Sequence, residues 1–143
     1  MKIVFLDTLS LGEDIPKTDF PFHDQITFYD KTEQDEVIDR CIDAEVVILN
    51  KINITKEIIK TCKRLKLLII TATGVDNIDL EAAKEKGVRV SNAVNYASES
   101  VTHSTFASYF YLNQSIGPYA KFVQEKKWSD HSYFSYFERF SDL

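Results

Sequence analysis

Short apolar runs alternate with amphipathic segments along the first part of the chain. Five short runs are predicted to be strands, and they lie at residues 2–7, 26–30, 45–51, 65–74 and 88–92. The first, KIVFLD, is apolar until a polar residue ends it, as is typical of a buried parallel strand. Between them, apolar residues fall on one helical face, which predicts helices at residues 32–44, 55–65 and 80–86. This alternation with short connections predicts an α/β fold, in which helices cover both faces of a five-stranded parallel sheet.

Single residues mark where these helices begin and end. Thr32 and Thr55 precede amphipathic segments, where a Thr hydroxyl can accept a backbone N–H of the first turn. Gly87 follows the third helix, at a position where glycine commonly ends helices. We therefore expect N-caps at Thr32 and Thr55 and a helix end at Gly87.

The pattern changes after Asn92. Residues 98–113 are apolar nearly all round, so we expect one long helix, capped by Ser98, that contacts protein on more than one side. Gly117 and Pro118 open another helix. Residues 128–140 hold six aromatic side chains in thirteen positions, too many for a solvated terminus. The sequence thus predicts a helical C-terminal arm.

Composition narrows the class of protein. The chain has 143 residues, 44% of them hydrophobic and 27% charged, which is typical of a globular domain. No apolar run approaches the ~20 residues that span a bilayer, and a net charge of −5 argues against nucleic acid or an anionic membrane as partner. The first residues do not resemble a signal peptide, so we expect a cytoplasmic protein.

Cysteine and histidine spacing predicts no metal site. Cys41 and Cys62 stand in helix-like segments without CxxC or Cys/His spacing, so we interpret them as reduced and structural. His23 and His131 have no partners at the spacing of metal ligands.

The run TATGVDNIDLEAA, residues 71–83, supplies the candidate binding site. Its Gly74 lies at the carboxyl end of a strand, where ligands bind in open α/β sheets. Lacking a Cβ, Gly74 lets the backbone approach a ligand and take up strained angles. Successive N–H groups of Thr73, Gly74 and Val75 could then hold a small anion. Acidic and amide side chains that can turn the chain and cap the next helix follow: Asp76, Asn77 and Asp79. Alternatively, Gly74 only makes a strand-to-helix turn.

Residues 71–112 resemble the N-terminal part of the D-isomer-specific 2-hydroxy acid dehydrogenases. The shared landmarks are the run Gly74-Val75-Asp76-Asn77-Ile78-Asp79, Ala82, Ala83, Gly87, Val90, Asn92, Ser100 and Val101. Residues 48–59 and 119–128 are similar to the glycerate or hydroxypyruvate dehydrogenase branch. The resemblance implies a flavodoxin-like substrate-binding domain at residues 1–96, with strand order 2-1-3-4-5. Residues 97–143 would be a bridging helix and aromatic dimerisation arm that lead to a nucleotide-binding domain.

The resemblance also implies site residues. The backbone of Thr73, Gly74 and Val75 would bind the substrate carboxylate, and Thr73 and Gly74 would border the nicotinamide of the cofactor. Asn50 and Lys51 fall in a loop that contacts substrate in the family, although Lys51 could equally be a solvated strand end. Val101 resembles the position that packs on the nicotinamide ring; otherwise it is a core residue of its helix.

The sequence departs from the family in two respects. His103 stands where Glu or Gln is common and Ser104 where His is frequent, so we interpret His103 as structural. Family members continue into a Rossmann domain with G-x-G-x-x-G and the Arg, Glu and His of catalysis, whereas the four glycines here are too scattered for that fingerprint. We therefore expect a truncated chain that is inactive alone, with no catalytic residue before Leu143 and no cofactor bound to it.

Three functions are compatible with these patterns. The first is the substrate-binding half of an NAD-dependent oxidoreductase that interconverts 2-oxo and 2-hydroxy acids by hydride transfer, acting as a homodimer through residues 98–143. The second is a regulatory relative that binds nucleotide without turnover. The third is a receiver-like signalling domain, which needs a phosphoacceptor Asp at the end of the third strand, where Asn50 stands.

Overall fold

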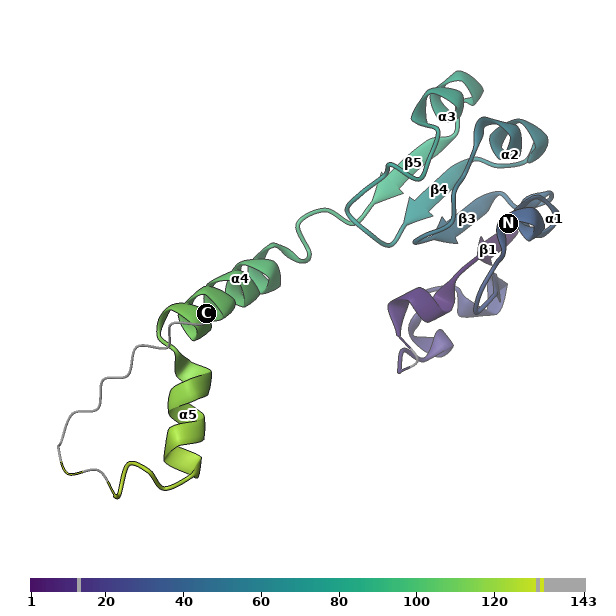
Figure 1. The fold of residues 1–143 in the computed structure, drawn as a ribbon. Helices are drawn as coiled ribbons and strands as arrows, with labels where there is room; N and C mark the ends of the chain where they lie inside the picture. The colour runs from purple at the N-terminus through teal and green to yellow at the C-terminus, as the bar shows by residue number, and fades with distance from the viewer. Residues whose placement is uncertain (13, 131, 133–143) are drawn as a thin grey trace. The chain divides into compact units, whose positions relative to one another are not determined.

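Five parallel strands form a single sheet (Figure 1). A computed structural model of the chain describes residues 1–12, 14–130 and 132. The strands are β1 (Ile3–Phe5), β2 (Ile26–Phe28), β3 (Val46–Leu49), β4 (Leu67–Ile70) and β5 (Arg89–Asn92). Their order is β2-β1-β3-β4-β5, and every neighbouring pair is parallel. This order confirms the predicted flavodoxin-type topology.

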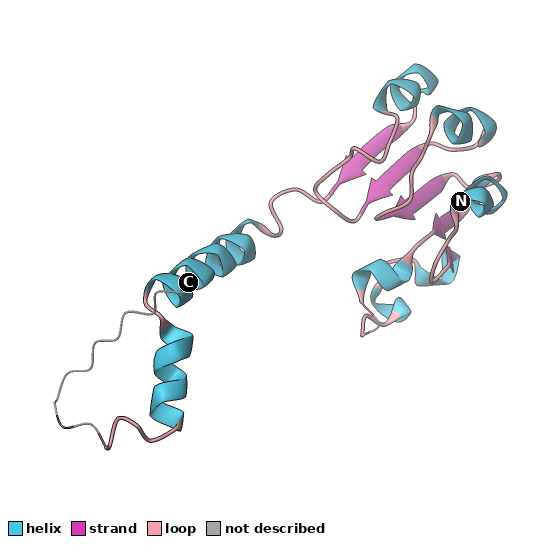
Figure 2. Ribbon diagram, in the orientation of Figure 1, coloured by secondary structure: helices cyan, strands magenta, loops and turns pink. Residues whose placement is uncertain are grey.

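Three short α-helices pack against one face of the sheet (Figure 2). They are α1 (Val37–Cys41), α2 (Lys56–Thr61) and α3 (Leu80–Lys86). The strands contribute alternate residues to this core, namely Val4, Leu6, Val47, Leu49, Leu68 and Ile70. Each such side chain stabilises the fold by about 1.5–3 kcal/mol when it is fully buried. The core therefore lies between the sheet and one layer of helices.

The opposite face is covered differently at β1 and β2. Phe5 points to this face, where its ring lies 5.8 Å from that of Phe20 and 6.4 Å from that of Phe28. Phe20 follows one of three short 3-10 helices that connect β1 to β2: η1 (Thr8–Leu11), η2 (Lys17–Asp19) and η3 (His23–Gln25). Pro16 and Pro21 interrupt this connection, because proline cannot continue a helix. Short turns and 3-10 helices therefore cover this face at β1 and β2.

Two of the predicted helix ends are confirmed. The hydroxyl of Thr55 accepts the N–H of Ile58 at 3.4 Å, so Thr55 is the N-cap of α2. Gly87 ends α3 in the left-handed conformation with φ +73°, which glycine adopts without strain.

The other two predicted caps are wrong. Thr32 donates its hydroxyl to the carbonyl of Leu6, and the 3-10 helix η4 (Gln34–Glu36) that precedes α1 is capped by Glu33 instead. Glu33 and Glu36 form a reciprocal capping box there. Ser98 is the first residue of the long helix, and the residue before it, Ala97, makes no side-chain cap.

Both cysteines lie in the core as free thiols. Cys41 on α1 is 1% exposed, and Cys62 just after α2 is fully buried. Burial raises the pKa of Cys41 to about 12 and also raises the pKa of Cys62. Both side chains therefore remain protonated and act as small apolar residues.

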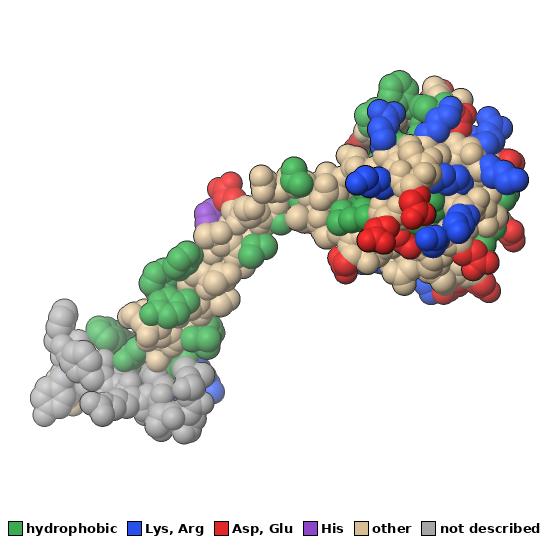
Figure 3. Space-filling model, turned by 90° about the horizontal axis from the view of Figure 1, so that it is seen from above, with side chains coloured by type: hydrophobic (Ala, Val, Ile, Leu, Met, Phe, Trp, Pro, Cys, Tyr) green, Lys and Arg blue, Asp and Glu red, His purple; other side chains and the backbone are tan. Residues whose placement is uncertain are grey.

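The chain divides into two compact units, Met1–Asn95 and Tyr96–Leu143. The second contains α4 (Ser98–Asn113) and α5 (Ile116–Gln124). None of the residues of α4 is buried, and hydrophobic side chains are visible along this unit in Figure 3. Among the described residues of this unit, the exposed large hydrophobic ones are Tyr96, Val101, Phe106, Tyr109, Phe110, Tyr111, Leu112, Ile116, Val123 and Trp128. His131 and the aromatic residues from 133 onward lie outside the described residues.

Two classes of feature are missing from the part of the chain that the structure describes. None of its helices has both the length and the apolar character needed to cross a membrane. Its His, Cys, Asp and Glu side chains form no group of three or more that could hold a metal ion.

Candidate functional site

The carboxyl ends of β1, β3, β4 and β5 meet at one edge of the sheet, as parallel strands require. Asp7 follows β1, Asn50 and Lys51 follow β3, and the loop that contains Gly74 follows β4. The predicted substrate-binding residues of the first unit therefore lie on two adjacent loops. Their role in binding stays a prediction.

The Gly74 loop is fastened to the end of β5. The side-chain Nδ2 of Asn92 donates to the carbonyl of Thr73 at 2.7 Å, and the hydroxyl of Thr73 donates to the carbonyl of Ala93 at 3.0 Å. Within the described part of the chain, the N–H groups of Gly74 and Val75 donate to no protein acceptor. Gly74 is exposed, so its N–H group is available to an anion.

Gly74 does not need its conformational freedom here. Its φ lies outside the left-handed region, in contrast to those of Gly12 and Gly87. Gly74 therefore does not use the left-handed conformation that glycine permits. A Cβ at this position would meet only the Oδ1 atom of Asp76, at 2.8 Å. What glycine provides is open space beside the backbone.

The Asn50–Lys51 turn is held by a carboxylate that the sequence analysis did not single out. Asp7, 6% exposed, accepts the N–H of Asn50 at 2.9 and 3.1 Å and the N–H of Lys51 at 2.7 Å. Burial raises the pKa of Asp7, although the N–H groups of Lys51 and Asn50 and the charge of Lys51 oppose this shift. The sequence signal for Asp7 was its position as the acidic residue that ends the first apolar run.

Asn77 links this turn to the Gly74 loop. Its side-chain nitrogen donates to the carbonyl of Asn50 at 3.1 Å and to that of Ile52 at 2.9 Å. Of the side chains predicted to cap the next helix, Asp79 does so, because its carboxylate accepts the N–H of Ala82 at 2.8 Å. Asn77 instead joins the two loops of the candidate site.

Two side chains of the turn leave polar atoms without a hydrogen bond within the described residues. The Oδ1 atom of Asn50 is buried and accepts no hydrogen bond within the described residues. The side chain of Lys51 is exposed and forms no ion pair with any described carboxylate. A positive charge and two free N–H groups on neighbouring loops could together attract a small carboxylate.

Val101 and His103 belong to the second unit. Val101 is 60% exposed on α4, and its predicted contact with a nicotinamide ring stays a prediction. The Nε2 atom of His103 lies 4.0 Å from the carboxylate of Glu99 one turn earlier, and both side chains are highly exposed. His103 is thus an exposed residue of α4, and its interpretation as structural stays a prediction.

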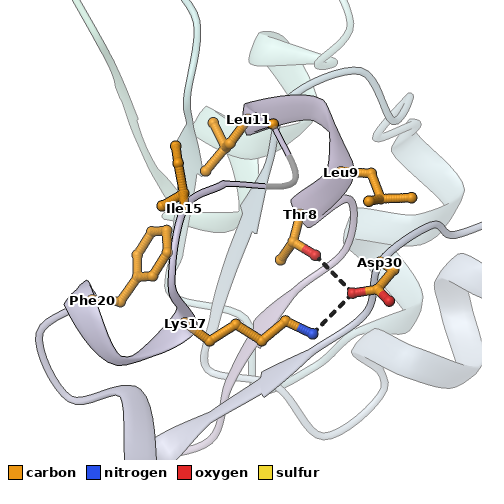
Figure 4. Close-up of a pocket in the computed structure, with 8 residues that line it drawn as sticks. Thr8, Leu9, Leu11, Ile15, Lys17, Phe20 and Asp30 are labelled. Carbon is orange, nitrogen blue, oxygen red and sulfur yellow. Dashed lines mark hydrogen bonds and ion pairs between the residues drawn. The ribbon is translucent and has the colours of Figure 1, made fainter.

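A separate cavity of about 190 Å³ opens where β1 and β2 end (Figure 4). The carboxylate of Asp30 accepts from Lys17 at 2.9 Å and from Thr8 at 3.1 Å. The hydrogen bond from Lys17 is the main reason that the pKa of Asp30 is lowered. Figure 4 shows Leu11, Ile15 and Phe20 along the other side of the cavity. The polar side chains of Thr8, Lys17 and Asp30 are thus hydrogen-bonded to one another. None of the predicted site residues lines this cavity.

Comparison with known proteins identifies relatives of the chain. A model of the D-isomer specific 2-hydroxyacid dehydrogenase catalytic domain matches residues 3–129. The chain is 34% identical over 137 residues to a glycerate dehydrogenase of Methylorubrum extorquens, covering 96% of the chain and 43% of that protein. It is 31% identical over 135 residues to a hydroxypyruvate reductase of Blautia hydrogenotrophica, covering 92% of the chain and 42% of that protein. The chain thus spans less than half the length of these relatives.

A solved structure shares the fold. The acyclic imino acid reductase Bsp5, determined in complex with NADPH and D-Arg, is 25% identical and superposes with a TM-score of 0.70. The superposition covers 94% of this chain and 43% of the reductase.

Proposed function

Because the chain belongs to the D-isomer specific 2-hydroxyacid dehydrogenase family, we propose that it is the substrate-binding part of an oxidoreductase that interconverts 2-oxo and D-2-hydroxy acids. The observation that carries this proposal is the pair of free N–H groups at Gly74 and Val75, at the carboxyl edge of the sheet. The adjacent turn bears the exposed side chain of Lys51.

These groups have a simple task in the reaction. The N–H groups of Gly74 and Val75 hold the carboxylate of the acid, and the ammonium group of Lys51 adds favourable charge on the same rim. Fixing the carboxylate orients the adjacent C2 atom, which is the carbon that gains or loses hydride. Substrate orientation is therefore the contribution of this chain.

The chain can contact only part of a dinucleotide. Thr73, Gly74 and Val101 are the residues proposed to border a nicotinamide ring, and NAD is the proposed cofactor. When bound, the cofactor supplies the hydride chemistry. The four glycines do not form a strand-to-helix fingerprint that could hold the phosphates. We assign phosphate binding, and the Arg, Glu and His of catalysis, to a nucleotide-binding domain outside these 143 residues.

The second unit completes the proposal. Residues 97–143 act as a bridging helix and dimerisation arm, and residues 1–96 as the substrate-binding domain. Support comes from α4, whose aromatic residues Phe106, Tyr109 and Phe110 are each at least half exposed. Such a surface favours association with a second copy. A cytoplasmic location is part of the same proposal.

The test uses the complete reading frame that contains this chain. The purified protein should oxidise NADH with hydroxypyruvate or glyoxylate and form the D-isomer wherever the product is chiral. The 143-residue chain alone should show no turnover and should bind NADH in the millimolar range or worse. Nucleotide binding by the complete protein without turnover of any 2-oxo acid would contradict the proposal and favour the regulatory relative.

A further inference from the structure

The backbone ladder between β1 and β3 ends in an unusual way. Its last regular bond runs from the N–H of Leu6 to the carbonyl of Ile48 at 3.0 Å. In a parallel ladder the next bond would join the N–H of Asn50 to the carbonyl of Leu6. Thr32 occupies that carbonyl with its hydroxyl, and the N–H of Asn50 turns to the carboxylate of Asp7. A side chain thus replaces the backbone as the acceptor for this turn.

The same turn is held from its other side by Asn77. Asp7 accepts two N–H groups of the turn, those of Asn50 and Lys51, while Asn77 donates to two carbonyls, those of Asn50 and Ile52. The backbone of Asn77 adds to this link, because its carbonyl accepts the N–H of Ile54 at 2.8 Å. The carboxylate of Asp7 thus accepts backbone N–H groups of the turn, and the side chain of Asn77 donates to its backbone carbonyls. The two side chains follow different strands, β1 and β4.

Asp7 lies almost fully out of water. Burying a carboxylate costs free energy unless hydrogen bonds compensate for its lost hydration. Asp7 receives both of the N–H groups that follow β3, and its own carbonyl accepts the N–H of Ser10 at 3.0 Å and the hydroxyl of Ser10 at 2.6 Å. The residue is thus tied on both sides, which fixes its position at the edge of the sheet.

We propose that Asp7 and Asn77 are positioning residues that clamp residues 50–52 against the Gly74 loop. The clamp sets where Lys51 stands relative to the free N–H groups of Gly74 and Val75. This inference rests on the proposed function, because it assigns the clamp a purpose in holding a 2-oxo acid. Neither Asp7 nor Asn77 touches the substrate in this scheme. Each acts through the loop that it holds.

The clamp itself can be tested on the 143-residue chain by recording the amide resonances of a ¹⁵N-labelled sample. Asp7→Ala should shift the resonances of Asn50 and Lys51 directly, and those of Gly74 and Val75 through Asn77. Asn77→Ala should shift the same four resonances. Asp43→Asn is the matched control, because Asp43 is an exposed carboxylate whose contact with Lys2 lies at the opposite edge of the sheet.

Two outcomes of this experiment would decide the clamp. Shifts at Gly74 and Val75 in Asp7→Ala support it, provided that Asp43→Asn leaves them in place, because Asp7 is distant from both residues in the sequence. Unchanged resonances at Gly74 and Val75 in the folded Asp7 variant would overturn it, as would unchanged resonances of Asn50 and Lys51 in Asn77→Ala. If Asp7→Ala does not fold, Asp7→Asn replaces it, because the amide keeps the size of the side chain and one of its two acceptor atoms.

The positioning role is tested on the complete protein by steady-state kinetics with hydroxypyruvate. Asp7→Asn and Asn77→Ala should each raise KM by about ten-fold while kcat changes by no more than about two-fold. The Kd for NADH should stay at the wild-type value. The double variant should raise KM by less than the product of the two single effects, because both residues hold one turn.

The failures of the two proposals are distinguishable. A wild-type protein without turnover would contradict the proposed function, and the resonance shifts would still decide the clamp. An active wild type with an unchanged KM in both folded variants would overturn the positioning role. Loss of kcat at constant KM would overturn it too, because the clamp acts on binding of the acid.

Discussion

The ammonium group of Lys86 on α3 donates to the carbonyl oxygen of Cys62, at the end of α2, at 3.0 Å. The same nitrogen also donates to the carbonyl of Ile59 and, at 3.3 Å, to that of Lys60. The last carbonyls of a helix have no partner within it. One side chain of α3 thus caps the C-terminus of α2, with a charge that suits this end of a helix.

Lys86→Met should therefore destabilise the first unit by about 1–2 kcal/mol, because three carbonyls, two of them in part-buried hydrogen bonds, lose their donor while the apolar stem is kept. Urea unfolding followed by circular dichroism measures the change in the free energy of unfolding. Lys84→Met, at an exposed position of the same helix, is the matched control and should change it by less than about 0.5 kcal/mol. Equal effects of the two variants would contradict the capping role.

The raised pKa of Asp7 predicts the direction in which the stability of the fold changes with pH. Burial raises its pKa above the ordinary value of 3.8, so the folded chain binds this proton more tightly than the unfolded chain. The stabilising contribution of the protonated carboxyl is complete below 3.8 and is lost as the pH rises through the raised pKa.

Asp7→Asn removes this titration, and unfolding free energies between about pH 3 and pH 6 should reveal it. The free energy of the variant minus that of the wild type should become more positive as the pH rises. Asp43→Asn, which removes an exposed carboxylate, controls for general charge effects. A difference for Asp7→Asn that falls with pH would contradict the direction of the shift.

Gly74 allows the binding site to be tested with little effect on the fold. Gly74→Val places a branched side chain beside the free N–H groups, so kcat/KM of the complete protein should fall by at least about ten-fold. Only the exposed Asp76 carboxylate must move to accommodate a Cβ, so the folded state should persist.

Gly87→Ala is the matched control for Gly74→Val. At φ +73° an alanine is strained, so this variant should lose about 1 kcal/mol of stability. Its kinetics should remain normal, because Gly87 ends α3 away from the Gly74 loop. Near-normal kinetics of a folded Gly74→Val variant would contradict a role in binding and would mean that Gly74 only makes a strand-to-helix turn.

The exposed apolar residues of the second unit predict self-association. Light scattering at micromolar concentration should give twice the 16.5 kDa mass of the chain, since each buried aromatic side chain favours association by about 1.5–3 kcal/mol. Replacing both Phe106 and Phe110 by Ser should weaken the dimer, and deleting residues 114–143 should dissociate it. A clean monomer of the unaltered chain would refute this prediction.

Local signals in the sequence were enough for the sheet and for part of the site. The apolar runs located all five strands, and Thr55 and Gly87 act within their own helix turns, so short-range rules identified them. Thr32 was misread because its hydroxyl bonds to Leu6, 26 positions earlier in the chain. Asp7 was missed because the N–H groups that it accepts lie 43 and 44 positions later. Such partners are determined by strand order, which brings distant segments together.

The two buried thiols make it possible to measure how often the first unit unfolds locally. A protonated thiol is a poor nucleophile, and one without contact to water cannot meet an alkylating reagent. Cys41 and Cys62 therefore react with iodoacetamide only when the core around them opens. The second unit contains no cysteine. The alkylation rate of the chain thus reports how often the first unit opens. Motions of α4 and α5 do not contribute to this rate, because neither helix contains a cysteine.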